Sequence, residues 1–196
     1  MLQRGMTEDD LQNILREFKG LMLDADGVWF DGHETRLVMP SGEVGIIKTR
    51  DFRDGQGLSF LRAIGIRVVF ATGEGHPLES IVQKINAAPS VQSGAWAPVE
   101  FFTGELNSGG KVASLESWLI KHELEWSDCV YIGDDRTDVE AMQLAGLKVA
   151  PNDAQRVIRP IVDLVLTKNG GAGAVREFAE MVLDARGIDE ATLPTA

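Results

Sequence analysis

Short apolar runs separated by helical segments are the feature that most constrains the fold of this chain. From Asp54 onward, segments with apolar residues at i, i+3 and i+4 alternate with runs of three to six apolar residues. Strands separated by helices of about ten residues are typical of βαβ units, whose strands run parallel in one sheet. The expected strands span residues 21–23, 66–71, 129–132, 147–150 and 162–166, with 99–103 as a candidate sixth. The sequence therefore predicts an α/β fold with a Rossmann-like, doubly wound parallel sheet.

Length, charge and cysteine content limit the class of protein. The 196 residues, 44% of them hydrophobic, suffice for one buried core, so a single domain over residues 1–196 is expected, with a tail at 187–196. A formal net charge of −11 argues against nucleic acid or an anionic membrane as partner. No run approaches the roughly 18 apolar residues of a membrane span, and no signal peptide is recognisable, so a cytoplasmic location is expected. Cys129 lies in an apolar run and is expected to be a buried thiol.

Two segments precede the alternating region. Within residues 1–19, an amphipathic helix is expected from Thr7 to Phe18. Thr7 and Asp10 resemble a capping pair, and one face carries the apolar residues Leu11, Ile14, Leu15 and Phe18. Residues 28–48 contain two short strands around a Pro-Ser-Gly-Glu turn and are expected to form a β-hairpin flap. A hairpin is marginally stable alone, so it is also a candidate contact with another subunit. Trp29, at its start, is expected to contact substrate or a neighbouring subunit.

Polar residues follow or face the ends of the predicted strands. Because the carboxyl ends of parallel strands share one edge of a sheet, residues far apart in sequence should converge there. The residues concerned are Asp24, Asp26, Thr72, Gly73, Lys111, Asp134, Asp135 and Asp138. Isolated strand-end aspartates are also common in turns and helix caps, so the joint pattern carries the prediction.

These residue types fit phosphoryl chemistry. Asp24 and Asp26 are two like charges close together, and a hard cation such as Mg²⁺ beside them accounts for that arrangement. The Thr72 hydroxyl, the backbone amides of Thr72 and Gly73, and the Lys111 ammonium are suitable donors to a phosphoryl group. One carboxylate is then available to attack phosphorus and a second to transfer a proton, which is the aspartyl-phosphate route.

The motifs resemble those of the haloacid dehalogenase superfamily of phosphohydrolases. Four of its motifs occur in order, as Asp24-Ala25-Asp26-Gly27-Val28, Thr72-Gly73, Lys111, and Gly133-Asp134-Asp135-Arg136-Thr137-Asp138. Within it, the chain is similar to the small phosphatases of 3-deoxy sugar acids, the 3-deoxy-D-manno-octulosonate 8-phosphate phosphatase subfamily. That similarity includes Arg53-Asp54-Gly55-Gln56-Gly57 and the glycine-rich stretch from Gly170 to Glu177.

The resemblance implies a role for each matching residue. Asp24 would be the nucleophile and Asp26 the general acid/base, while Thr72, Gly73 and Lys111 would bind the phosphoryl group. Mg²⁺ would be held by Asp24, the backbone carbonyl of Asp26 and Asp134, and Asp135 and Asp138 would orient metal waters or Lys111. Members of the subfamily lack a large cap domain, and hairpins from neighbouring subunits close the site in a homotetramer.

The resemblance also leaves the substrate open. Octulosonate phosphatases usually carry Arg after Thr-Gly, whereas this chain has Glu74, as in relatives acting on nine-carbon sugar acid 9-phosphates. Glu74, Arg53 and Arg176 are candidates for substrate specificity, with surface salt bridges as the alternative for the two arginines. We therefore expect a Mg²⁺-dependent phosphomonoesterase acting on a 3-deoxy-2-keto sugar acid. The alternatives are a phosphatase for another small phosphorylated metabolite and a catalytically silent tetrameric interaction module.

Overall fold

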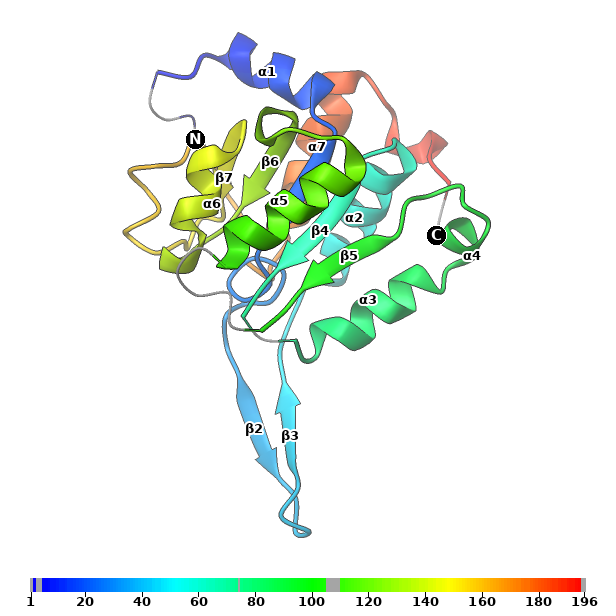
Figure 1. Ribbon diagram of the computed structural model, residues 1–196, viewed down its shortest axis with the longest axis vertical. Helices are drawn as coiled ribbons and strands as arrows, with labels where there is room; N and C mark the ends of the chain where they lie inside the picture. Colours follow the sequence, from blue (N-terminus) through cyan, green and yellow to red (C-terminus); the bar gives the residue numbers. More distant parts are fainter. Residues whose placement is uncertain (1, 3–4, 74, 105–109, 195–196) are drawn as a thin grey trace.

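The computed structural model describes residues 2, 5–73, 75–104 and 110–194. Its centre is a six-stranded parallel sheet in the order β5-β4-β1-β6-β7-β8 (Figure 1). The strands are β1 (Gly20–Leu23), β4 (Arg67–Ala71), β5 (Val99–Phe102), β6 (Cys129–Ile132), β7 (Leu147–Ala150) and β8 (Leu164–Val165). All four residues of β1 are buried, because β1 lies in the middle of the sheet with helices over both faces. The predicted parallel α/β sheet is confirmed, and the candidate strand at 99–103 forms its edge.

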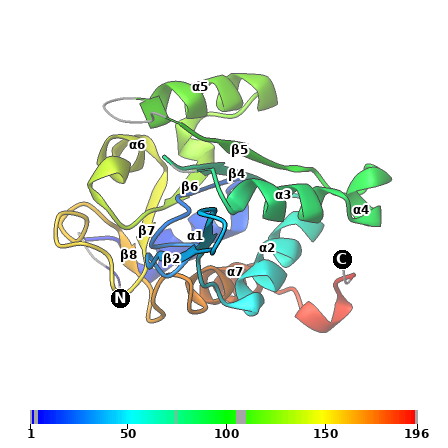
Figure 2. The same cartoon turned by 90° about the horizontal axis from the view of Figure 1, so that it is seen from below.

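The helices form two layers around the sheet (Figure 2). One layer contains α1, α2, α3 and α7, whose apolar residues share one core with β1. The other contains α5 and α6, packed on the opposite face. Their bounds are α1 (Glu8–Glu17), α2 (Phe52–Ala63), α3 (Leu78–Asn86), α5 (Gly110–His122), α6 (Val139–Leu144) and α7 (Ala174–Arg186). Short turns of 3₁₀ helix span Trp126–Asp128, Arg136–Asp138 and Glu190–Thr192. None of the helices in the described ranges is long and apolar enough to cross a membrane.

The predicted N-terminal helix begins with the expected cap. Thr7 is the N-cap of α1, and its hydroxyl accepts a hydrogen bond from the Asp10 backbone amide at 3.1 Å. The Asp10 carboxylate in turn accepts from the Thr7 amide, which completes a capping box. A one-turn helix, α4 (Pro89–Gln92), was not expected from the sequence. It lies in the connection between α3 and β5.

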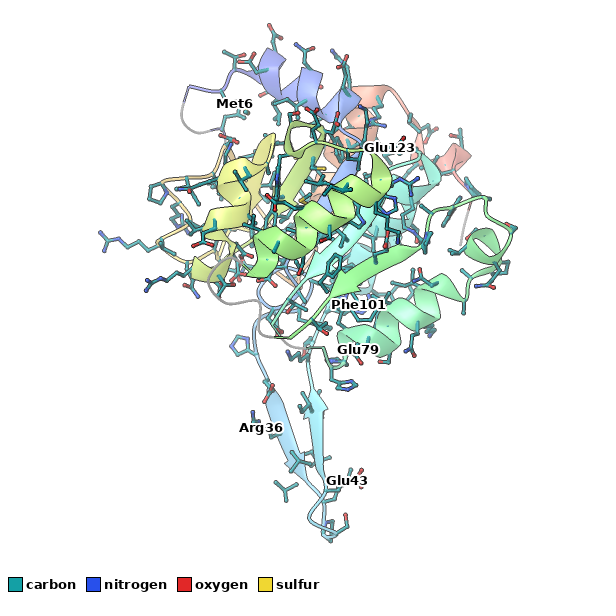
Figure 3. All side chains as sticks on the ribbon, in the orientation of Figure 1. Met6, Arg36, Glu43, Glu79, Phe101 and Glu123 are labelled. Atoms are coloured by element: carbon teal, nitrogen blue, oxygen red, sulfur yellow. The ribbon has the colours of Figure 1, made fainter. Side chains whose placement is uncertain are left out.

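A two-stranded antiparallel hairpin, β2 (Thr35–Val38) and β3 (Val44–Ile47), leaves the carboxyl edge of the sheet (Figure 1). It extends away from the body of the molecule, and the Arg36 and Glu43 side chains project from it (Figure 3). The projecting segment is shorter than the predicted flap of residues 28–48. Residues 28–30 are buried beneath it, and the Trp29 ring packs edge-on against Phe70. The expectation that Trp29 contacts substrate or a neighbouring subunit was therefore wrong, since its ring belongs to the core of the same chain.

Candidate active site

Three aspartates meet where β1 and β6 end. Asp24 directly follows β1, while Asp135 and Asp138 belong to the turn after β6. One carboxylate oxygen from each lies within 4.8 Å of the others. The two strands are neighbours in the sheet, with Leu23 paired to Ile132, so the segments that follow them must lie side by side. These three of the predicted residues therefore lie close together at this edge of the sheet.

Lys111 bridges two of these carboxylates. Its ammonium nitrogen lies 2.9 Å from Asp24 Oδ2 and 2.7 Å from Asp138 Oδ1, and the residue is only 3% exposed. Burial by itself lowers the pKa of a lysine, but the charges of Asp138 and Asp24 outweigh it and raise the pKa of Lys111 above its usual value. Lys111 therefore carries a positive charge that is held in place between these two carboxylates.

Asp138 is saturated by protein donors. Its Oδ1 accepts from Lys111 and from the Tyr131 hydroxyl at 2.8 Å, while Oδ2 accepts from the backbone amides of Asp134 and Asp135 at 2.9 and 3.1 Å. A carboxylate with four donors has little capacity left for a cation. Asp138 thus fixes the turn after β6 and binds the Lys111 ammonium. Tyr131 was not predicted, although a tyrosine in a buried strand signals a hydroxyl that needs a partner.

Asp134 has an oxygen without a partner. Its Oδ1 is buried and makes no hydrogen bond, an arrangement that is costly for a carboxylate. Burial, together with the nearby charges of Asp138 and Asp135, raises the pKa of Asp134 to about 8. A Cβ atom on Gly27 would lie 2.2 Å from Asp134 Oδ2, and Gly27 has φ of +82°. The loop that follows β1, residues 24–28, is called the β1 loop below. Only glycine lets it approach this carboxylate.

The surroundings of Asp24 also disfavour the ionised form of its carboxylate. Burial, reinforced by the negative charge of Asp138, raises the pKa of Asp24 well above its usual value, although Lys111 opposes the shift. Its Oδ1 accepts from the Ala25 amide at 2.6 Å. A divalent cation next to Asp24 and Asp134 would favour both ionised forms and give the unpartnered oxygen a ligand to bind. The donor set, carboxylate oxygen, fits a hard ion such as Mg²⁺.

Asp26 is held by Lys48, a residue whose role was not predicted from the sequence. Lys48, which follows β3, places its ammonium nitrogen 2.8 Å from each carboxylate oxygen of Asp26. The Lys48 side chain is 3% exposed and its nitrogen lies 5.8 Å from the centre of the Phe30 ring. Lys48 lies at the end of an exposed hairpin, and nothing in the neighbouring sequence indicates that its side chain contacts the β1 loop.

The second motif lies after β4. Thr72 is buried, and its backbone amide donates to the Phe102 carbonyl at 3.1 Å. The expectation that this amide binds a phosphoryl group was wrong, because it extends the hydrogen bonding between β4 and β5. The Thr72 hydroxyl and Gly73 remain candidates. Glu74 lies outside the described residues.

The two arginine candidates lie elsewhere. Arg53 and Arg176 line a cavity of about 250 Å³ with Gln56, Thr167, Lys168, Gly173, Glu177 and Glu180, and none of the clustered aspartates lines it. Each arginine is paired within its own chain. Arg53 binds Asp51 at 2.6 Å, and Arg176 binds Glu180 at 2.5 Å and also pairs with Glu190. Their side chains are therefore not brought to the carboxylate cluster.

The two further motifs of the resemblance contact each other. Asp54, which is completely buried, accepts from the backbone amides of Gly173 and Arg176 at 3.1 and 2.8 Å and so caps α7. The glycine-rich stretch also closes on the β1 loop. Gly171 donates to the Val28 carbonyl at 2.8 Å, and a Cβ atom on Gly170 would lie 1.8 Å from the Gly27 carbonyl oxygen. These glycines are required for close backbone packing against the β1 loop.

Comparison with known proteins agrees with this architecture. Residues 78–178 match the model of the haloacid dehalogenase-like hydrolase family. The chain is 30% identical over 177 residues to the 3-deoxy-D-manno-octulosonate 8-phosphate phosphatase of Haemophilus influenzae, covering 90% of this chain and 89% of that protein. This chain is a haloacid dehalogenase-like hydrolase. The expected family is thereby confirmed, and with it membership among phosphoric monoester hydrolases.

Other relatives of the hydrolase extend the comparison. The phosphatase of the same name from Salmonella typhi is 32% identical over 172 residues, covering 87% of this chain and 82% of that protein. The structure of the Yersinia pestis phosphatase matches with a TM-score of 0.76 and 27% identity over 91% of this chain and 88% of that one. The Moraxella catarrhalis phosphatase, solved with magnesium ion, phosphate ion and KDO, matches with a TM-score of 0.74 and 26% identity over 92% and 94%.

Proposed function

We propose that this hydrolase is a Mg²⁺-dependent phosphomonoesterase that works through an aspartyl-phosphate intermediate. The observation that supports this best is the buried Lys111 ammonium held between Asp24 and Asp138, together with a buried Asp134 oxygen that has no partner. One carboxylate, one fixed ammonium and one open carboxylate oxygen provide a nucleophile, a phosphoryl-binding charge and a place for a cation.

Magnesium would be held by Asp24, Asp134 and the backbone carbonyl of Asp26. When bound, it would supply positive charge to the phosphoryl oxygens and stabilise ionised Asp24. Asp138 is excluded from this set by its four protein donors. Asp135 already accepts from the Thr137 amide and hydroxyl, both at 2.7 Å, and is assigned to the outer ring of groups that orient metal waters.

The proposed reaction has two displacement steps. An Asp24 carboxylate oxygen attacks phosphorus, the ester P–O bond breaks, and Asp26 gives its proton to the departing sugar oxygen. A water then attacks the aspartyl phosphate, Asp26 takes a proton from that water, and inorganic phosphate leaves as Asp24 is regenerated. Lys111 and the Thr72 hydroxyl hold the phosphoryl oxygens through both steps.

For the substrate, we propose a 3-deoxy-2-keto sugar acid carrying a terminal phosphate. The relatives named for 3-deoxy-D-manno-octulosonate 8-phosphate support this class, and Glu74 supports a nonulosonate 9-phosphate within it. Another small phosphorylated metabolite is the second candidate. A silent interaction module is disfavoured, because such a module has no need for a buried lysine between two carboxylates.

We also propose that the chain forms a homotetramer through its hairpin. Consecutive apolar residues are exposed on both strands, Leu37 and Val38 on β2 and Ile46 and Ile47 on β3, with Val38 68% exposed. Because neighbouring residues of a strand face opposite ways, both faces of the ribbon are apolar. Light scattering should give a mass near four times that of the 21.4 kDa chain. Val38→Asp should lower the mass of the assembly, whereas Ser117→Asp, on the exposed face of α5, should not.

A substrate panel with metal titration tests the reaction. Phosphate release should depend on Mg²⁺ and should be fastest with octulosonate 8-phosphate or a nonulosonate 9-phosphate, relative to simple sugar phosphates. Asp24→Asn should abolish turnover while far-UV circular dichroism and Mg²⁺ binding are largely kept. Full activity in that variant would exclude the covalent mechanism, and no Mg²⁺-stimulated release across the panel would favour the silent module.

A further inference from the structure

Each aspartate of the β1 loop has its own lysine, and the two lysines come from different parts of the chain. Asp24 pairs with Lys111 at the start of α5, and Asp26 pairs with Lys48 at the end of the hairpin. Both ammonium groups are almost completely buried, with 3–4% of each side chain exposed. Lys111 is accounted for by the proposed phosphoryl contact. Lys48 touches Asp26, which the proposed reaction uses for proton transfer.

We propose that Lys48 is a positioning residue that fixes the Asp26 carboxylate for proton transfer and links this step to the seating of the hairpin. This inference rests on the proposed function. The two equal distances of 2.8 Å place the ammonium symmetrically between the carboxylate oxygens and so select one orientation of the carboxylate plane. Each oxygen retains a further lone pair for the proton that is exchanged with the leaving group or with water.

The surroundings of Lys48 make this contact stiff. The Lys48 ammonium lies over the ring of Phe30, which is buried at 2% exposure. The Asp31 amide donates to the Thr49 carbonyl at 3.0 Å and closes the base of the hairpin next to Lys48. The Asp26 side chain is 37% exposed, so without the ammonium it would be free to rotate toward solvent. Orientation of a reacting group is worth large rate factors, and small displacements reduce them.

The test compares Lys48→Met with Lys48→Arg and with Lys84→Met, a control on the exposed face of α3. Methionine keeps an unbranched apolar side chain and removes the charge. We expect kcat on octulosonate 8-phosphate to fall about 10–100-fold in Lys48→Met with KM within about twofold, partial recovery in Lys48→Arg, and no change in Lys84→Met. A rise in KM at unchanged kcat would overturn the proposal, because Lys48 would then bind substrate.

A second variant set separates positioning from general damage. If Lys48 acts through Asp26, Lys48→Met should cause no further loss when added to Asp26→Asn. An undiminished loss in the Asp26→Asn background would contradict the proposal. If Lys48→Met fails to fold, Lys48→Gln in the same pair of backgrounds gives the same comparison.

A readout other than activity keeps this test apart from that of the proposed function. In a crystal structure of the Mg²⁺-loaded wild type, the Asp26 carboxylate should occupy one ordered rotamer. In the corresponding structure of Lys48→Met, it should occupy several rotamers or a different one. An unchanged rotamer in Lys48→Met would overturn the positioning role even if phosphate release were observed. If no substrate of the panel releases phosphate but the Asp26 rotamer changes as expected, only the proposed function is overturned.

Discussion

Replacement of Asp54 by alanine should destabilise the protein more than removal of an ordinary helix cap. The Asp54 carboxylate is completely buried and accepts from two amides, those of Gly173, the N-cap of α7, and Arg176 in its first turn. Each buried amide that is left without an acceptor costs about 1–3 kcal/mol. Burial raises the pKa of Asp54, so its removal also relieves the cost of burying a charge. We therefore expect a net loss of about 2–4 kcal/mol in unfolding free energy.

Urea and thermal unfolding measure this loss. For a chain of this size, it corresponds to a fall in Tm of about 10 °C. Asp54→Asn retains one carbonyl acceptor and should lose roughly half as much. Asp51→Ala is the matched control, because Asp51 caps α2 at the surface and should cost about 1 kcal/mol. If Asp54→Ala is no more destabilising than Asp51→Ala, the assignment of Asp54 as the buried cap of α7 is refuted.

Three further predictions concern the site and the core. Gly27→Ala should weaken Mg²⁺ binding about 10–100-fold by calorimetry, because the new Cβ would displace the Asp134 carboxylate; unchanged affinity would contradict the assigned metal site. Treatment with EDTA should abolish phosphate release and added Mg²⁺ should restore it, whereas activity that persists in EDTA would exclude the metal. Burial raises the pKa of Cys129 to about 12, so at pH 8 only about one thiol in ten thousand is ionised and the folded protein should not react with Ellman's reagent until urea is added.

Much of the sheet could be predicted because its strands are buried on both faces. Such strands are continuous apolar runs, and β1 and β6 match the expected spans within a residue. The strand expected at 162–166 is reduced to Leu164–Val165, since it pairs with β7 only at the edge of the sheet. Trp29 was misplaced for a related reason. An aromatic residue next to a hairpin has the same local pattern whether its ring packs inward or outward, and only the contact with Phe70 decides.

The site was predictable to the extent that topology determines it. Parallel strands brought Asp24 and Asp138 together, and the order of the motifs along the chain indicated Lys111. Contacts that depend on how distant segments return to the loop could not be predicted. The contact of Lys48 with Asp26 depends on the path of the hairpin, and the contact of Asp54 with Gly173 joins residues 119 apart in the sequence.

The closure of Gly170 and Gly171 over the β1 loop has a consequence for the order in which the protein is made. Asp24 and Asp26 leave the ribosome before Gly170 and Gly171, whose backbone packs behind them. The loop can reach its final shape only after residue 171 has emerged and α7 has docked on Asp54. A nascent chain would thus carry its acidic motif without a working site until Gly170 and Gly171 have been added, and a chain truncated before Gly170 would be inactive even with every proposed catalytic residue present.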